Sequence, residues 1–209
     1  MWQNINRIHP PQGSNVKPGA SPATFFIPPR ILCLDVCAAS SHRSLAPRRL
    51  RIAIIRSSSS RYQAMLRGEQ IVDDSSEAAR MILEELGHEV THTGLVGDDL
   101  IGIRTQVVGA LARGFDVIVV IGGTGFSPKD VTVEAIRPLL EKEIEGVGEI
   151  FRLESYRRVG FPAAFSRSLA GVIRGSIILA LPGSPDAVET AIRLIGPELP
   201  HMVFVAREA

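Results

Sequence analysis

The stretch "DVIVVIGGTGFSPKDVT", residues 116–132, decides the fold. Residues 117–121 are all apolar and β-branched, without polar alternation, which is typical of a central strand covered on both faces. This run leads directly into Gly122, Gly123 and Gly125. In an open parallel sheet, ligands bind at the carboxyl ends of the strands. The stretch therefore predicts a buried strand followed by a candidate binding loop.

Short β-branched runs alternate with helical periodicity on both sides of this stretch. We expect further strands at residues 52–55, 88–93 and 177–181. We expect helices at about residues 74–86, from residues 98–99 to the glycine at 114, at about 131–141 and 162–173, and from 184 toward 199. Alternating strands and helices predict βαβ units, hence an α/β domain with a mostly parallel sheet.

Local signals indicate where several helices begin and end. Asp74, with Glu77 three residues later, resembles a capping box, and Gly87 follows the same helix as a terminator. Ser184 as N-cap and Pro185 at the first helical position begin the last helix. Residues 57–60, four consecutive serines, are expected to form a loop.

Composition limits the classes of function. Of 209 residues, 45% are hydrophobic and 22% are charged, which is enough for one substantial core. Lys and Arg number 23 against 22 Asp and Glu, so the net charge of +1 provides no large field for binding nucleic acid. No apolar run approaches the length of a membrane span. We expect a soluble, cytoplasmic protein without nucleic-acid or membrane partners.

The first 50 residues differ from the rest. They contain seven of the 14 prolines and two of the 19 glycines, and six basic residues against one acid. We therefore predict an N-terminal extension over residues 1–48, with little packed structure, and a domain over residues 49–209. A transit peptide is the alternative for the extension. Its cysteines, Cys33 and Cys37, lack the spacing of a zinc site.

The glycine turn can be interpreted in two ways. Glycines allow backbone amides to approach an anion, and the following helix adds the positive end of its dipole, so the turn is a candidate phosphate site. The alternative is a tight turn that binds nothing. The turn is not a Walker A loop, because Lys129 follows Pro128 rather than a glycine. It also lacks the third glycine of the dinucleotide fingerprint.

Four motifs in order carry a family resemblance. They are "GGTGFSPKDVT" (122–132), "EGVGEIFR" (145–152), "FSRSLAGV" (165–172) and "LPGSPDAV" (181–188). Together they resemble the molybdopterin-binding family, specifically the molybdopterin adenylyltransferases of the molybdenum cofactor biosynthesis B and G type. The second motif favours the B type, and the resemblance runs from about residue 51 to 206.

The resemblance implies a three-layer αβα domain that transfers AMP from MgATP to the terminal phosphate of molybdopterin and releases pyrophosphate. The expected cofactor is Mg²⁺ with ATP, and molybdopterin is the substrate. The resemblance also implies a homo-oligomer, trimeric or hexameric, and a handover of the product to a metal-insertion protein.

Carried onto this chain, the resemblance implies two catalytic and metal-binding acids, Asp98 and Asp130. Carboxylates suit a metal that bridges ATP oxygens, although both acids also fit the ordinary preference for acids at helix N-termini. The implied ligand-binding residues are Gly122, Gly123, Thr124, Gly125, Ser166, Arg167, Pro182, Gly183 and Ser184. A plain surface helix is the alternative for Ser166 and Arg167, and ordinary capping is the alternative for Ser184.

The chain departs from the family pattern at two places. Relatives usually have "DxSG" where residues 73–77 read "DDSSE", with Glu77 at the glycine position, so Asp74 and Ser75 are favoured as capping residues. Residues 54–61 read "IIRSSSSR", where many relatives carry an acid. A non-catalytic molybdopterin-binding or carrier homologue is therefore the rival hypothesis, although retention of both Asp98 and Asp130 favours an enzyme.

Overall fold

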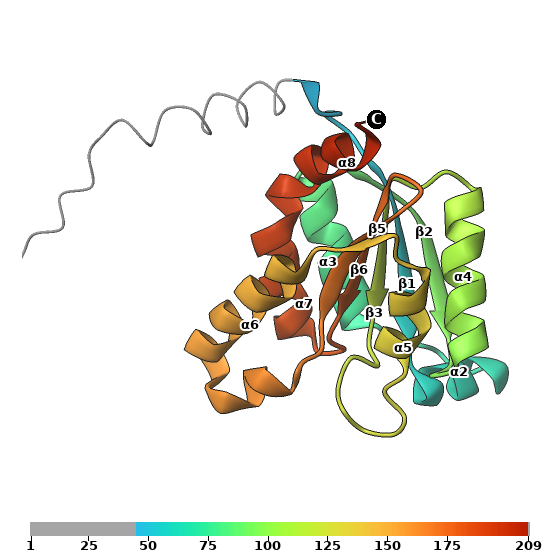
Figure 1. Cartoon of the computed structure of the whole chain (residues 1–209). Helices are drawn as coiled ribbons and strands as arrows, with labels where there is room; N and C mark the ends of the chain where they lie inside the picture. Colours follow the sequence, from blue (N-terminus) through green and yellow to red (C-terminus); the bar gives the residue numbers. More distant parts are fainter. Residues whose placement is uncertain (1–44, 209) are drawn as a thin grey trace, which may run out of the picture.

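The computed structural model describes residues 45–208, which form a central sheet with helices on both faces (Figure 1). This is the expected three-layer α/β architecture. The predicted extension, residues 1–48, lies almost entirely outside the described residues, as do both cysteines. No helix in the described part of the chain is long and apolar enough to cross a membrane.

The sheet has six strands in the order β2-β1-β3-β6-β5-β4. Its parallel part consists of β1 (Arg51–Ser57), β2 (Glu89–Val96), β3 (Val117–Ile121) and β6 (Ser176–Leu181). The strands β5 (Leu169–Ile173) and β4 (Lys142–Glu143) continue it in antiparallel pairing. The chain passes from β1 to β2 on one side and then to β3 on the other. The carboxyl ends of β1 and β3 therefore flank the point where strand order reverses, which is where ligands bind in such sheets.

Alternate residues of the central strands face two separate cores. Ile54 and Val119 face the core formed with α3 (Asp74–Glu85), α6 (Glu145–Val159), α7 (Pro185–Ile195) and α8 (Leu199–Arg207). Ile55 and Val120 face the core formed with α4 (Leu100–Ala112) and α5 (Thr132–Ile136). All five residues of β3 are fully buried, as the missing polar alternation predicted.

The helix predicted at residues 162–173 is wrong. The structure has a 3-10 turn at Phe161–Phe165, followed by strand β5. Arg174 and Gly175 have φ values of 50° and 76°, which is the positive-φ geometry of a two-residue hairpin, and they connect β5 to β6. Because β5 is short and nearly all buried, its apolar residues show no period that separates a strand from a helix.

Other boundaries also differ. The helix predicted at 131–141 ends at Ile136, because Pro138 lies in a 3-10 turn and the chain then extends into β4. The prediction of a loop at residues 57–60 is wrong in part, because Ser58 caps the helix α2 (Ser59–Leu66). Helices α6 and α8 were not predicted as separate elements. The N-cap of α3 is Asp73 rather than Asp74, and its side chain accepts a hydrogen bond from the Ser76 amide.

Candidate functional site

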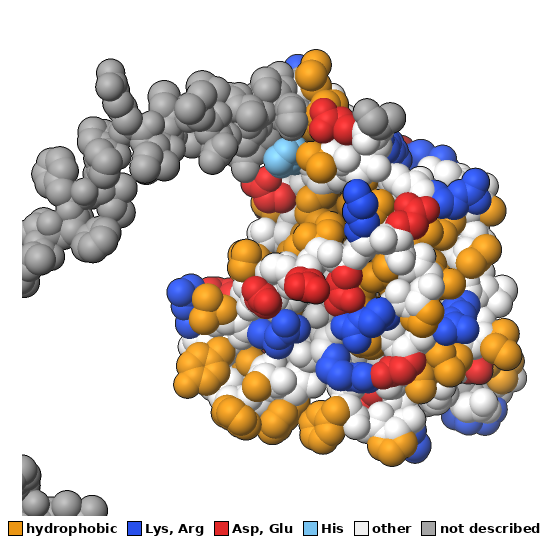
Figure 2. Space-filling view, viewed as in Figure 1, with side chains coloured by type: hydrophobic (Ala, Val, Ile, Leu, Met, Phe, Trp, Pro, Cys, Tyr) orange, Lys and Arg blue, Asp and Glu red, His pale blue; other side chains and the backbone are white. Residues whose placement is uncertain are grey.

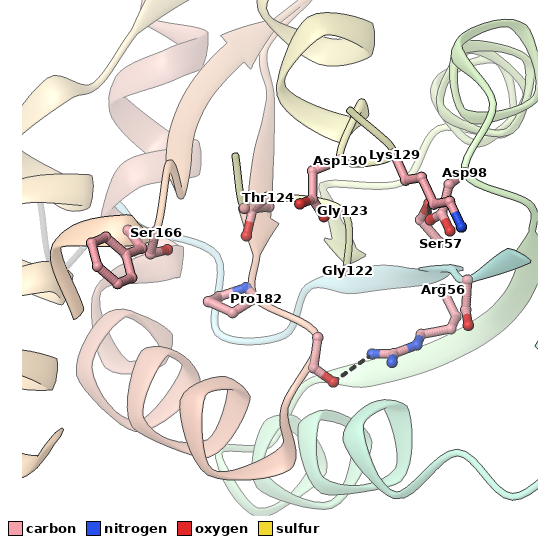
Figure 3. Close-up of a pocket in the computed structure, with 14 residues that line it drawn as sticks. Arg56, Ser57, Asp98, Gly122, Gly123, Thr124, Lys129, Asp130, Ser166 and Pro182 are labelled. Atoms are coloured by element: carbon pink, nitrogen blue, oxygen red, sulfur yellow. Dashed lines mark hydrogen bonds between the residues drawn. The ribbon is translucent and has the colours of Figure 1, made fainter. Parts of the chain in front are cut away.

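A cavity of about 400 Å³ lies at the carboxyl ends of β1, β3 and β6 (Figure 3). It contains the reversal point of the strand order described above. Its walls come from five loops that are distant in sequence. The lining residues are Arg56, Ser57, Ser58, Asp98, Gly122, Gly123, Thr124, Gly125, Lys129, Asp130, Phe165, Ser166, Pro182 and Gly183. Nine of the eleven residues predicted as site residues are therefore brought together.

The glycine turn after β3 has no room for side chains. Gly122 has φ of 104°, and a Cβ there would lie 2.3 Å from the carbonyl oxygen of Ser57. Gly123 has φ of 64°, and its Cβ would lie 2.5 Å from Oγ1 of Thr132. Both positions combine left-handed backbone with close contacts that a Cβ would violate. The turn thus brings the end of β3 directly against the end of β1.

The carbonyl oxygens of this turn are all bonded to the body of the protein. Gly122 O accepts from Thr132 Oγ1 at 2.7 Å, and Gly123 O accepts from the Thr132 amide at 3.0 Å. Thr124 O accepts from the Arg167 amide at 2.9 Å. Within residues 45–208, the amides of Gly123, Thr124 and Gly125 donate no hydrogen bond. These free donors in a cavity wall are suited to binding an anion.

Arg167 lies behind this loop rather than in the cavity. Its Nε donates to Gly125 O at 2.6 Å and its Nη2 donates to the carbonyl oxygen of Asp130 at 2.9 Å. The guanidinium also forms an ion pair with Glu134, and this hydrogen-bonded pairing lowers the pKa of Glu134. Arg167 was expected among the ligand-binding residues; it does not line this cavity, and its side chain is bonded to the carbonyl oxygens of the loop. Neither Arg167 nor Ser166 lies in a helix.

Asp130 lines the cavity at the end of the same loop. Its Oδ2 accepts a hydrogen bond from the Ser127 amide at 2.9 Å, which fixes the carboxylate across the loop. Asp98 lines the cavity from the loop before α4. Its Oδ1 accepts from Ser57 Oγ at 2.8 Å and its Oδ2 accepts from the Ser59 amide at 2.9 Å. The two predicted acids thus belong to one cavity.

The donor set of this cavity fits Mg²⁺ only in partnership with a substrate. In the described residues there is no cluster of three or more His, Cys, Asp and Glu side chains that could hold a metal. Mg²⁺ commonly takes one or two carboxylates together with substrate phosphates and water. Asp98 and Asp130 are suited to that mode, because a carboxylate oxygen that accepts one hydrogen bond retains another lone pair.

The cavity has two cationic side chains that the sequence analysis did not assign to it, Arg56 and Lys129. Arg56 is only 6% exposed, and desolvation by burial lowers its pKa. The available signal was a charged residue directly after the apolar run of residues 52–55, at the position where a strand meets its carboxyl-end loop. Together the two cations balance the charge of the two acids.

The loop after β6, residues 182–184, contains the other predicted ligand-binding residues, and these line two different cavities. Pro182 and Gly183 line the first cavity, whereas Ser184 lines a neighbouring cavity of about 400 Å³ that shares Ser166 and Pro182 with it. Ser184 occupies the N-cap position of α7, but its side chain makes no capping bond. Ser75 does not cap α3 either. Its buried hydroxyl donates to Gly183 O at 2.8 Å, so the residue holds the second loop in place.

This chain is similar in sequence to known proteins. Residues 53–201 match the domain family described as "Probable molybdopterin binding domain", and this range contains every residue of the first cavity. The chain is similar to Molybdenum cofactor biosynthesis protein B of Bacillus cereus, with 38% identity over 168 residues, which are 79% of this chain and 95% of that protein. The protein of the same name from Staphylococcus aureus is 43% identical over 137 residues, which are 64% of this chain and 82% of that protein.

A solved structure is also similar. The tungsten cofactor synthesizing protein MoaB from Pyrococcus furiosus matches with a TM-score of 0.70 and 35% identity, over 78% of this chain and 100% of that chain.

Proposed function

This chain belongs to the molybdopterin-binding domain family, and from that membership together with the cavity at the strand ends we propose that it acts in molybdenum cofactor biosynthesis as a molybdopterin adenylyltransferase. An oxygen of the molybdopterin phosphate attacks the α-phosphorus of ATP. A new P–O bond forms, the bond between the α-phosphorus and the bridging oxygen breaks, and pyrophosphate leaves.

The difficulty of this reaction is repulsion between anions. The attacking phosphate and the triphosphate must be held in line and close together, so a catalyst supplies positioning and charge stabilisation. Mg²⁺ bound with ATP would neutralise phosphate charge, and Asp98 and Asp130 are the residues that would hold it. The amides of Gly123, Thr124 and Gly125 would bind phosphate oxygens, and Lys129 would add positive charge.

One observation supports this proposal most strongly. Asp98 and Asp130 line the same cavity as the free amides of the glycine turn, although they come from loops after different strands. A protein that only binds a pterin has no need for two carboxylates beside an anion site, because they would repel a phosphate in the absence of a cation.

The decisive test is pyrophosphate release. Purified full-length protein with molybdopterin, ATP and Mg²⁺ is expected to release pyrophosphate and to form adenylylated molybdopterin in equal amounts, measured by a coupled phosphate assay and by mass spectrometry. Omission of Mg²⁺ should stop the release. Tight molybdopterin binding without any pyrophosphate would contradict the transferase proposal.

That negative outcome would favour the second candidate, a molybdopterin-binding carrier without catalytic activity. One feature favours it: both oxygens of Asp98 already accept hydrogen bonds, from Ser57 and Ser59. These bonds give Asp98 a role in joining two loops that needs no metal, as expected of a homologue without catalytic activity.

We further propose a homo-oligomer, trimeric or hexameric, that passes its product to a metal-insertion protein. Exposed apolar side chains support an interface: Figure 2 shows hydrophobic side chains gathered along the lower edge of the molecule. Large exposed apolar residues near the end of α6 and the following turn are Tyr156, Val159, Phe161 and Phe165. Contiguous apolar surface of this kind is typical of protein–protein contact sites. Light scattering coupled to size-exclusion chromatography would determine the oligomeric state.

A further inference from the structure

Arg56 is the last residue but one of β1, and its side chain lies on the α3 and α7 face of the sheet. Strand alternation explains this direction, because Ile52 and Ile54 face the same core. The guanidinium lies between two glycine-containing loops. Its Cζ is 3.9 Å from the position a Gly122 Cβ would occupy, and its Nη2 is 3.4 Å from the corresponding position at Gly183.

The guanidinium is buried with most of its donors unused. Nη1 donates to Gly183 O at 3.0 Å (Figure 3), which is the only hydrogen bond that Arg56 makes from its side chain within the described residues. Nε is buried without any hydrogen-bond partner in that part of the chain. An arginine carries five N–H donors, so such an arrangement leaves a strong bidentate donor face unsatisfied.

The nearby carboxylate of Asp73 does not satisfy these donors. Its Oδ1 is 3.7 Å from Arg56 Nε, which is an ion-pair distance but too long for a hydrogen bond. Asp73 is occupied as the N-cap of α3, where its side chain accepts from the Ser76 amide. Asp73 therefore offsets part of the charge without occupying the donor face, and an uncompensated buried donor of this kind is costly unless a ligand binds it.

We propose that Arg56 forms a phosphate-binding subsite on the α3 and α7 side of the cavity. This inference rests on the proposed function and specifies it further: the subsite takes a phosphate group of a substrate through the guanidinium of Arg56, whose Nη2 donates no hydrogen bond within the described residues. The shared ligand chemistry is a phosphate oxygen pair, which either ATP or the phosphate monoester of molybdopterin could supply. The subsite would thus hold an anion beside the amides of the glycine turn, in the same cavity.

The first experiment uses inorganic pyrophosphate as the probe, titrated into the full-length protein by calorimetry. The variant Arg56→Gln retains an N–H donor for Gly183 O but removes the charge and the bidentate face. Because a hydrogen bond to a charged group contributes substantially to affinity, we expect binding to weaken about ten- to hundredfold. Arg61→Gln is the matched control: Arg61 is nearby, bonds to Val72 O and does not line the cavity. The pyrophosphate affinity of Arg61→Gln should lie within about twofold of the wild-type affinity, as expected for a charge screened by solvent.

A second measurement distinguishes ligand binding from a purely structural role. The Nε–H resonance of Arg56 in the wild-type protein should shift as pyrophosphate is added, and this readout does not depend on how well the variant folds. An unshifted resonance, no pyrophosphate binding by wild type, or equal affinity in wild type and Arg56→Gln would each overturn the subsite.

Kinetics identify the substrate and separate this inference from the proposed function. In Arg56→Gln, a raised KM for ATP alone assigns the subsite to the nucleotide, whereas a raised KM for molybdopterin alone assigns it to the pterin phosphate. Absence of turnover in wild type would contradict the adenylyltransferase proposal, while the pyrophosphate titration would still report on Arg56. Both KM values unchanged in an active variant would overturn the subsite.

Discussion

Arg167 Nε lies 2.6 Å from the carbonyl oxygen of Gly125, across 42 positions of sequence. The bond connects the segment before β5 to the glycine turn after β3, and the Arg167 amide adds a second bond to Thr124 O at 2.9 Å. Because these bonds direct the carbonyl oxygens of the turn away from the cavity, they leave the amides free for an anion. The segment that leads into the antiparallel part of the sheet thus holds the glycine turn of the parallel part.

Arg167→Met should therefore impair the anion site without removing a ligand contact. We expect kcat for pyrophosphate release to fall at least about tenfold, because the variant loses the side-chain bonds of Arg167 to Gly125 O and Asp130 O, and loss of even one such charge-assisted bond amounts to about 1.5 to 3 kcal/mol. Molybdopterin affinity should change less. Steady-state kinetics measure the first effect, and Arg193→Met, an exposed ion-paired arginine on α7, is the control. Full activity of Arg167→Met would exclude this positioning role.

Asp130→Asn tests the acid held by the loop. The amide retains an oxygen for the Ser127 N–H but loses the negative charge that would hold Mg²⁺. Turnover should fall by at least about a hundredfold, since metal stabilisation of phosphate charge amounts to several kcal/mol. Molybdopterin binding, measured by fluorescence titration, should persist. The control is Asp74→Asn, which changes an exposed acid outside the cavity and should leave turnover unchanged. Unchanged turnover in Asp130→Asn would remove Asp130 from the mechanism.

Gly122→Ala tests the packing of β3 against β1. The added Cβ would meet Ser57 O at 2.3 Å, and φ is 104°, so backbone strain and a clash add together. We expect the free energy of unfolding to fall by at least about 2 kcal/mol. Gly109→Ala is the opposite control: it lies within α4 with open space around its Cβ, so it should stabilise by about 0.5 to 1 kcal/mol. Urea denaturation measures the free energy of unfolding of both variants, and an equal change in Gly122→Ala and Gly109→Ala would contradict the expected clash.

The parallel part of the sheet could be predicted from the sequence because its strands are short runs rich in apolar and β-branched residues that alternate with helical periodicity, β3 being entirely β-branched. The antiparallel part could not. Strand β5 contains Ala170 and Gly171, and its direction depends on the hairpin at Arg174 and Gly175, which no periodicity indicates. Gly171 is required there because a Cβ would lie 2.7 Å from the carbonyl oxygen of Lys142 in β4, a contact that exists only in the folded sheet.

The candidate site also has a part that could be predicted from the sequence and a part that could not. The glycine turn and Asp130 are neighbours in sequence, so local motifs were enough to place them together. The bonds of Arg56 and Ser75 to Gly183 span 127 and 108 positions, so they depend on which strands lie side by side. A serine after Asp74 has the same local signature whether it caps a helix or holds a distant loop.

His88 gives a prediction for the pH dependence of stability. The side chain is 6% exposed, and burial lowers its pKa below the usual value of roughly 6.5. Below that value the unfolded chain takes up a proton that the folded state resists, so the free energy of unfolding should decrease as the pH falls from 7 toward 5. The contribution of one such group cannot exceed about 1.4 kcal/mol per pH unit.

Urea denaturation at a series of pH values gives the slope of the free energy of unfolding against pH. Between pH 5 and 7 this slope should be shallower in His88→Gln than in wild type, whereas the two proteins should have the same slope between pH 7.5 and 8.5. His92, whose pKa is also lowered by burial, should contribute part of the remaining pH dependence, so the double variant should show a smaller pH dependence than His88→Gln. Equal slopes for wild type and His88→Gln between pH 5 and 7 would show that the folded protein accepts the proton without cost.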